Sequence, residues 1–239
     1  MDDRLKKIIE ESQNIVFFGG AGVSTESGIP DFRSESGLFS TKKKYGYSPE
    51  EILSYSFFIN NTELFFEYYR INMIYSDARP NQAHIALAEL EAEGKLKAIV
   101  TQNIDGLHTM AGSKIVYELH GSIRRNTCMK CKEKYTLEYI VNSKETIPHC
   151  EKCGGIIKPD VVLYEEGLDE ITLQAAVNSI GKADTLIVGG TSLVVYPAAG
   201  LLNYFKGKRM VVINKTETEY DNRASLVICD SIGKVLMNR

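Results

Sequence analysis

The stretch Gly19–Arg33, GGAGVSTESGIPDFR, guides the interpretation of the whole chain. It follows the apolar run Ile15–Phe18, which is typical of a buried strand. The segment Gly20-Ala21-Gly22 then lets the backbone approach a phosphate closely, and a helix N-terminus there can offer free N–H groups. A tight structural turn without a ligand explains this motif alone equally well.

After its second glycine the stretch departs from the dinucleotide fingerprint of dehydrogenases. Thr25 occupies the place of the third glycine, and Gly28 and Pro30 prevent a long helix. The chain continues instead with an acid, an aromatic ring and a cation, Asp31, Phe32 and Arg33. We therefore predict a pyrophosphate ligand and disfavour hydride transfer.

Composition limits the class of protein. The 239 residues are 44% apolar, enough for one elaborated domain or two small ones. The net charge of −3 does not indicate a nucleic-acid partner. The chain contains no apolar run of about 18 residues, so we predict no membrane span. The first twelve residues form a charged amphipathic pattern rather than a signal peptide, so we expect a cytoplasmic protein.

Four cysteines follow the spacing C-x2-C, an 18-residue gap and C-x2-C: Cys128, Cys131, Cys150 and Cys153. This spacing is typical of a four-thiolate zinc site. A pair of disulfides is the alternative, and a reducing cytosol disfavours it. Four thiolates close the coordination shell, so we expect a structural rather than a catalytic zinc. We expect Cys229, within an apolar run, to be buried.

Apolar runs alternate with helical patterns and predict a doubly wound α/β fold with a mainly parallel, Rossmann-like sheet. Strands are expected at 14–18, 97–101, 115–119, 160–164, 184–189, 209–213 and 225–229. Helices are expected near 80–93, 169–181 and 197–207. Residues 34–75 and 123–157 interrupt the alternation, and the rings of the first interruption have the helical spacing of a core.

These interruptions predict two domains. Residues 1–33, 76–122 and 158–239 would form the larger, Rossmann-like domain. A helical insertion with a cofactor loop (34–75) and a zinc-binding insertion (123–157) would together form the smaller one, with a ligand site in the cleft between the two domains.

Polar residues follow several strands of the predicted sheet. Gln102, Asn103 and Asp105 come after one strand, where they would converge with the Gly20 loop on one crevice. An Asx-rich turn explains them equally well. His120 ends the next strand and is either a general base or a structural histidine. Thr191 and Ser192, and then Asn214 and Lys215, follow two later strands.

In combination the motifs resemble the sirtuin family of NAD-dependent protein lysine deacylases. The resemblance covers nearly the whole chain and rests on motifs that occur in family order: GAGVSTESGIPDFR, TQNIDGLH, Leu119-His120-Gly121, the four cysteines, KPDVVLYEEGL, GGTSLVVYPA and the Ile213-Asn214 pair.

The resemblance implies the roles of individual residues. His120, as general base, and Asn103 would be catalytic. NAD would contact Gly20, Ala21, Gly22, Thr25, Asp31, Phe32, Arg33, Gln102, Asn103, Ile104, Asp105, His120, Thr191, Ser192, Asn214, Lys215, Asp230 and Ile232. A substrate peptide would pair as an added strand with the segment that holds Val161, Leu163, Tyr164, Glu165 and Glu166.

The reaction implied by the resemblance consumes NAD. Acetyl-lysine and NAD would give lysine, nicotinamide and O-acetyl-ADP-ribose. The expected partners are acetylated lysines in proteins or peptides, and we expect a monomer that binds neither nucleic acid nor a membrane. A protein mono-ADP-ribosyltransferase and a non-catalytic zinc-stabilised binding module are the alternatives.

Two features bear on specificity. Glu165 stands where family members commonly have glycine, which favours a preference for basic peptides. The segment after Arg33 lacks the Tyr-x-x-Arg pair of members that remove acidic acyl groups, so desuccinylation is not expected.

Overall fold

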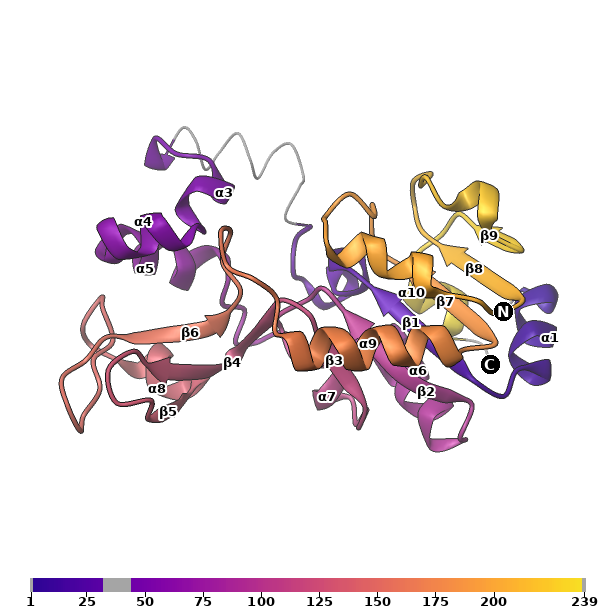
Figure 1. Ribbon diagram of the computed structural model, residues 1–239, viewed down its shortest axis with the longest axis horizontal. Coiled ribbons are helices and arrows are strands. Elements are labelled where there is room, and N and C mark those ends of the chain that lie inside the picture. The colour runs from indigo at the N-terminus through magenta and orange to yellow at the C-terminus, as the bar shows by residue number, and fades with distance from the viewer. Residues whose placement is uncertain (1, 32–43, 238–239) are drawn as a thin grey trace.

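A six-stranded parallel sheet organises the larger part of the chain (Figure 1). The computed structural model describes residues 2–31 and 44–237. In spatial order the strands are β3 (Val116–Glu118), β2 (Leu96–Thr101), β1 (Ile15–Gly19), β7 (Thr185–Gly189), β8 (Arg209–Ile213) and β9 (Leu226–Ile228). The chain adds strands outward from β1 on one side and from β7 on the other. The point between β1 and β7 is therefore the topological switch point, beyond which parallel sheets bind ligands.

Helices cover both faces of this sheet, as the strand β1 shows. Ile15 and Phe17 pack into a core with α1 (Asp3–Glu11), α6 (Gln82–Ala92) and α10 (Ile232–Leu236). Val16 and Phe18 face the opposite core, which includes α9 (Glu170–Lys182) and the 3-10 helix η3 (Ala198–Tyr204). Burial on both faces explains why these strands are continuous apolar runs. The predicted doubly wound α/β fold is confirmed.

A second sheet of three antiparallel strands lies in the other part of the molecule (Figure 1). Its order is β5 (Lys134–Thr136), β4 (Gly121–Cys128) and β6 (Ile157–Val161), and α8 (Leu137–Asn142) follows β5. The strand expected at 160–164 in the parallel core is therefore wrong. Its residues begin at the end of β6, where buried and half-buried side chains alternate, as expected for an antiparallel strand with one covered face.

Three short helices complete the smaller part: α3 (Pro49–Ile52), α4 (Tyr55–Asn60) and α5 (Thr62–Asn72). The expected aromatic core is confirmed, because six rings are buried there together with residues of β4, α8 and the end of β6: Phe57, Phe58, Phe65, Phe66, Tyr68 and Tyr69. The guanidinium of Arg70 joins α5 to α8 and to the loop after it, because it donates to the carbonyls of Ile140, Glu145 and Thr146.

We propose the domain division predicted above, with 1–33, 76–122 and 158–239 in the larger unit and 34–75 and 123–157 in the smaller. Strands β4 and β6 run across the boundaries at 122/123 and 157/158, so the small sheet also connects the two units. None of the helices in the described part of the chain has the length and apolar character needed to cross a membrane.

Candidate active site

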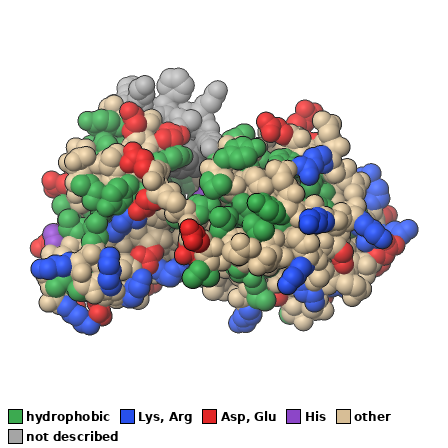
Figure 2. Space-filling model, in the orientation of Figure 1, with side chains coloured by type: hydrophobic (Ala, Val, Ile, Leu, Met, Phe, Trp, Pro, Cys, Tyr) green, Lys and Arg blue, Asp and Glu red, His purple; other side chains and the backbone are tan. Residues whose placement is uncertain are grey.

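A cleft with a volume of about 500 Å³ lies beyond the carboxyl ends of the central parallel strands. Figure 2 shows the surface hollowed between the two parts of the molecule. One wall consists of residues that follow β1, β2, β3 and β7: Gly20, Ala21, Gln102, Asn103, Ile104, Asp105, His120, Gly190, Thr191 and Ser192. The opposite wall comes from the smaller part and from residues 161–166. The predicted convergence of distant polar residues is therefore present in the fold.

Two glycine-containing turns interlock at the switch point. The N–H of Gly22 donates to the carbonyl of Gly190 at 2.8 Å. A Cβ added to Gly22 would lie 2.7 Å from the Cα of Gly190, and one added to Gly20 would lie 2.7 Å from the Cβ of Thr191. Both distances are too short for a side chain. Close packing between the two turns thus accounts for these glycines even before any phosphate is considered.

A chain of hydrogen bonds fixes the polar groups after β2. The side-chain amide of Asn103 donates to Ser24 Oγ at 3.0 Å, and Ser24 Oγ donates to Asp105 Oδ2 at 2.6 Å. The other oxygen of Asp105 accepts the N–H of Leu107 at 2.8 Å, at the start of α7 (Leu107–Met110). Gln102 reaches across the switch point to donate to Thr191 Oγ1 at 3.0 Å. Asp105 therefore forms the Asx turn that was one explanation of this segment, and it also lines the cleft that was the other.

His120 is the half-buried histidine of the cleft. Its Nδ1 lies 2.9 Å from the carbonyl oxygen of Gln102, which can only accept a hydrogen bond, so Nδ1 carries the proton. Nε2 then holds the free lone pair. Burial lowers the pKa of His120 below the ordinary histidine value of about 6.5, and the bond to Gln102 opposes this shift. The ring is therefore neutral near pH 7 and can accept a proton.

Several residues expected at the cofactor do not line the cleft: Gly22, Thr25, Asn214, Lys215, Asp230 and Ile232. Thr25 Oγ1 donates to the Gly22 carbonyl, and Ile232 is 2% exposed in the sheet core. Asn214 and Asp230 follow β8 and β9, beyond β7, and bond to Thr216 and Lys234 respectively. Phe32 and Arg33 lie outside the described residues, whereas Asp31 lines the cleft.

The opposite wall contains every residue expected to contact a substrate peptide: Val161, Leu163, Tyr164, Glu165 and Glu166. The N–H of Val162 donates to the carbonyl of His120 at 2.9 Å, so this wall is joined directly to the histidine. Glu166 accepts from Lys158 at 2.9 Å and from the N–H of Leu163 at 2.8 Å.

The four cysteines form a compact group away from the cleft. All four Sγ atoms lie within 4.8 Å of one another, and the Cys128–Cys153 and Cys131–Cys150 pairs are 3.5 Å apart. A zinc ion with Zn–S bonds of 2.3 Å would separate tetrahedral sulfurs by about 3.8 Å, so the donor set and spacing fit zinc. All are free thiols, and the disulfide alternative is not present.

Two tyrosines support the second cysteine turn. Tyr135 Oη donates to Cys150 Sγ at 3.1 Å and accepts the N–H of Glu151 at 3.0 Å. Tyr139 Oη donates to the carbonyl of His149 at 2.8 Å. A bond to a ligand sulfur, as from Tyr135, orients that ligand and tunes the metal site.

Cys229, expected to be buried, is exposed, because the chain leaves the sheet at this position.

Comparison with known proteins identifies the family. Residues 20–197 match the Sir2 family. The chain belongs to the Sir2 family. It is 67% identical over 234 residues to an NAD-dependent protein deacetylase of Clostridium acetobutylicum, covering 98% of this chain and 96% of the relative. A protein of the same name from Staphylococcus aureus (strain N315) is 47% identical over 234 residues, covering 98% and 96%.

Solved structures of Sir2 proteins have the same fold. One described as a Sir2–p53 peptide–NAD+ complex superposes with a TM-score of 0.88 at 36% identity, covering 99% of this chain and 96% of that chain. Another, described as a Sir2 homologue–NAD complex, has a TM-score of 0.88 at 39% identity, covering 99% and 91%.

Ser24 is a cleft residue of this Sir2 chain that sequence reasoning missed. It is 1% exposed and bridges Asn103 and Asp105, about 80 positions further along the chain. Its position just after Gly20-Ala21-Gly22 was the signal in the sequence that could have indicated it, but only the fold shows its partners.

His84 and His108 form a separate buried pair with ring centroids 4.7 Å apart. Burial lowers the pKa of both rings.

Proposed function

We propose that this Sir2-family chain is an NAD-dependent protein lysine deacetylase. Acetyl-lysine, NAD and water react to give lysine, nicotinamide and O-acetyl-ADP-ribose. One observation carries the proposal: a neutral histidine base and a fixed Asn103–Ser24–Asp105 network face one cleft at the switch point of a Rossmann-like sheet. This is the position where such sheets bind dinucleotides.

The wall formed by residues after β1, β2, β3 and β7 would bind NAD, with different residues at each part of the molecule. Gly20 and Ala21 border the pyrophosphate, and Thr191 and Ser192 border the adenosine half. Asn103, Ile104 and Asp105 surround the nicotinamide, and Gln102 is next to its ribose. Gly22, Thr25, Asn214, Lys215, Asp230 and Ile232 support this site from outside the described cleft lining, and Asp31, Phe32 and Arg33 complete it.

His120 acts as the general base. The acetyl oxygen bonds to the ribose carbon as the bond from that carbon to nicotinamide breaks. A ribose hydroxyl then attacks the acetyl carbon, and one water is consumed as the lysine amine leaves, so the acetyl group ends on the ribose hydroxyl and its former oxygen stays on the ribose carbon. Nε2 of His120 takes the proton of the attacking hydroxyl, because Nδ1 is already bonded to Gln102. Asn103, with its amide fixed by Ser24, orients the reacting groups.

The acetyl-lysine peptide binds along residues 161–166 as an added strand. The backbone of Tyr164 is already bonded to Leu53 and Tyr55 on one side. The peptide therefore uses backbone groups of the segment other than those of Tyr164, and residues 161–166 all line the cleft.

The charge of the cleft favours an uncharged acyl group. Its described lining includes four carboxylates, Asp31, Asp105, Glu165 and Glu166, and no lysine or arginine. A succinyl group would bring a further negative charge beside these carboxylates, and the described lining has no cation to pair with it, which is costly in a partly desolvated site. Acetyl-lysine is the better substrate on this argument.

The test is incubation with NAD and matched acetyl-lysine and succinyl-lysine peptides, following nicotinamide release and peptide mass. We expect the acetyl peptide to lose its acetyl mass only when NAD is present, and the succinyl peptide to react at least about tenfold more slowly. Adenine-labelled NAD whose label stays on protein would instead support mono-ADP-ribosyl transfer. No nicotinamide release with any peptide would leave a binding module as the better assignment.

The cellular setting is part of the proposal. Four free thiols arranged for zinc suit a reducing compartment, so we place the protein in the cytoplasm. The net charge of −3 supports a protein that does not depend on nucleic acid. We also propose that it acts as a monomer, since one chain supplies both walls of the cleft and the site needs no residue from a second copy.

A further inference from the structure

The peptide-facing segment 161–166 is tied to the smaller part of the molecule through Tyr164. Its N–H donates to the carbonyl of Leu53 and its carbonyl accepts the N–H of Tyr55, both at 3.0 Å. These two bonds form a short parallel bridge between the loop after β6 and the start of α4. At its other end the segment is bonded to the carbonyl of His120 through Val162.

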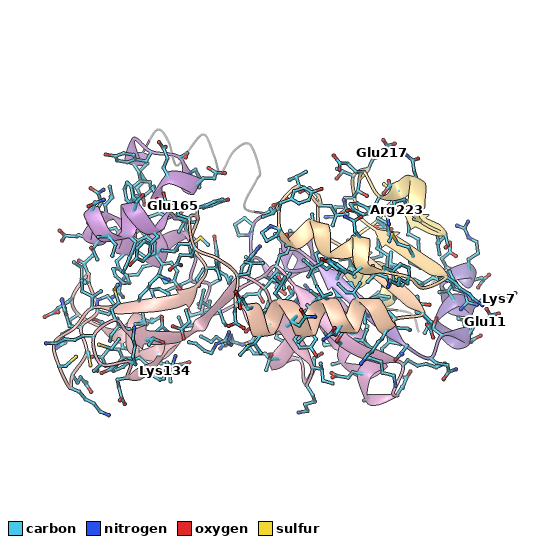
Figure 3. The ribbon with its side chains drawn as sticks, in the orientation of Figure 1. Lys7, Glu11, Lys134, Glu165, Glu217 and Arg223 are labelled. Carbon is cyan, nitrogen blue, oxygen red and sulfur yellow. The ribbon has the colours of Figure 1, made fainter. Side chains whose placement is uncertain are left out.

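Glu165 adds a second attachment at the same place. One carboxylate oxygen accepts the N–H of Ser56 at 2.8 Å, and the other accepts the hydroxyl of Ser56 at 2.8 Å. Figure 3 shows Glu165 on the loop after β6, directed toward α4. Hydrogen bonds to an ionised carboxylate are stronger than neutral ones, and two on one side chain also fix its direction.

The backbone of Glu165 adopts a conformation that disfavours any side chain. Its φ angle is +78°, in the left-handed region that glycine occupies most readily. A residue with a side chain carries backbone strain in this region, which its contacts must offset. The N–H of Glu166 donates to the carbonyl of Leu163 at 3.0 Å and closes a turn with Glu165 at its third position, and the two bonds to Ser56 fix the Glu165 side chain on that turn.

We propose that Glu165 is a positioning residue that latches the peptide-binding segment onto α4. The inference rests on the proposed function, because it assumes that residues 161–166 hold the acyl-lysine peptide. With the latch closed, the segment is fixed at Val162 and at Tyr164–Glu165 before any peptide arrives. A preorganised strand loses less conformational entropy on binding, so the latch lowers the peptide KM and leaves the chemical step unchanged.

The rival explanation is direct recognition of basic peptides by the Glu165 charge. Both Glu165 and Ser56 are exposed, so the carboxylate is also accessible from solvent. Glu50, in α3, is a matched control, because it lines the same surface recess as Glu165 and makes none of the bonds described above. Glu50→Gln removes one charge from the recess and leaves the latch intact.

The experiment compares Glu165→Ala, Ser56→Ala, the double variant and Glu50→Gln with an uncharged acetyl-lysine peptide. We expect Glu165→Ala to raise the peptide KM about fivefold, with kcat and the NAD KM nearly unchanged. The double variant should be no worse than Glu165→Ala, because the bonded pair is already broken. Glu165→Gly, which loses the bonds but also the strain, should fall between wild type and Glu165→Ala.

Hydrogen exchange of the amides of residues 161–167 provides a readout that does not depend on activity. The latch predicts faster exchange in Glu165→Ala than in wild type or Glu50→Gln. Unchanged exchange, additive effects in the double variant, or a KM effect confined to basic peptides and shared by Glu50→Gln would each overturn the latch. A wild-type chain that deacetylates no peptide would contradict the proposed function instead, and the exchange data would still decide on the latch.

Discussion

The cleft and the cysteine group both collect reactive side chains, but they are assembled in opposite ways. The cleft takes its polar residues from turns far apart in the chain, from Gly20 to Ser192, and leaves an opening of about 500 Å³. The cysteine group takes four sulfurs from two nearby turns and packs them within 4.8 Å of one another. An open site has room for substrates, whereas a closed set of four thiolates leaves a metal no free position. The difference separates the site of chemistry from the site of stabilisation.

The largest expected effect comes from removing the base in the cleft. His120→Ala should lower the deacetylation kcat by about 100-fold or more, because it removes the ring nitrogen Nε2 that takes the proton of the attacking hydroxyl in the proposed mechanism. Zinc content, measured by atomic absorption, should stay equal to that of wild type. His149→Ala is the control, since this histidine is exposed in the zinc-binding part and pairs with Glu145. Wild-type rates in His120→Ala would contradict the division of roles between the two regions.

A smaller effect is expected when the support of the cysteine group is weakened. Tyr135→Phe removes the hydroxyl that donates to Cys150 Sγ and should increase zinc transfer to a coloured chelator by about tenfold. Tyr139→Phe is the matched control, because it loses a bond to the His149 carbonyl rather than to a ligand sulfur.

The deacetylation rate of zinc-loaded Tyr135→Phe should equal that of wild type, because the hydroxyl supports the cysteine group and not the cleft. Equal rates of zinc transfer from Tyr135→Phe and Tyr139→Phe would show that the sulfur bond has no special role.

The smallest effect concerns pH. Because burial lowers the pKa of His120, its neutral, base-competent form persists below the ordinary histidine value of about 6.5. The profile of kcat/KM should therefore stay level as pH falls to 6.5 and decline only below it. An acidic limb centred above 6.5 would show that another group controls the rate.

The sequence predicted local features better than distant contacts. The cysteine spacing, the parallel strands and the helical aromatic run each carry their signal within a few tens of residues, and the structure has all three. The expected strand at 160–164 failed because Val161-Val162-Leu163 is apolar for a different reason: its buried residues pack on the aromatic core of the smaller part.

The finer contacts of the site could not be read from the chain. Ser24 meets Asp105, and Glu165 meets Ser56, across separations of 81 and 109 residues. No spacing rule relates such positions, because only the packed sheet and the bridge at Tyr164 bring them together. Glu165 illustrates the limit: its charge predicts a preference for basic peptides, and no pattern in the sequence indicates the bonds between its carboxylate and Ser56 of α4.

The interlocked turns at Gly20–Gly22 and Gly190 also constrain how this chain can vary. Each turn occupies the space that a side chain on the other would need, so neither can accept a larger residue alone. Directed evolution of cofactor preference would gain little by randomising these glycines. Ser192, which borders the same opening without being part of the interlock, is a better position at which to introduce diversity.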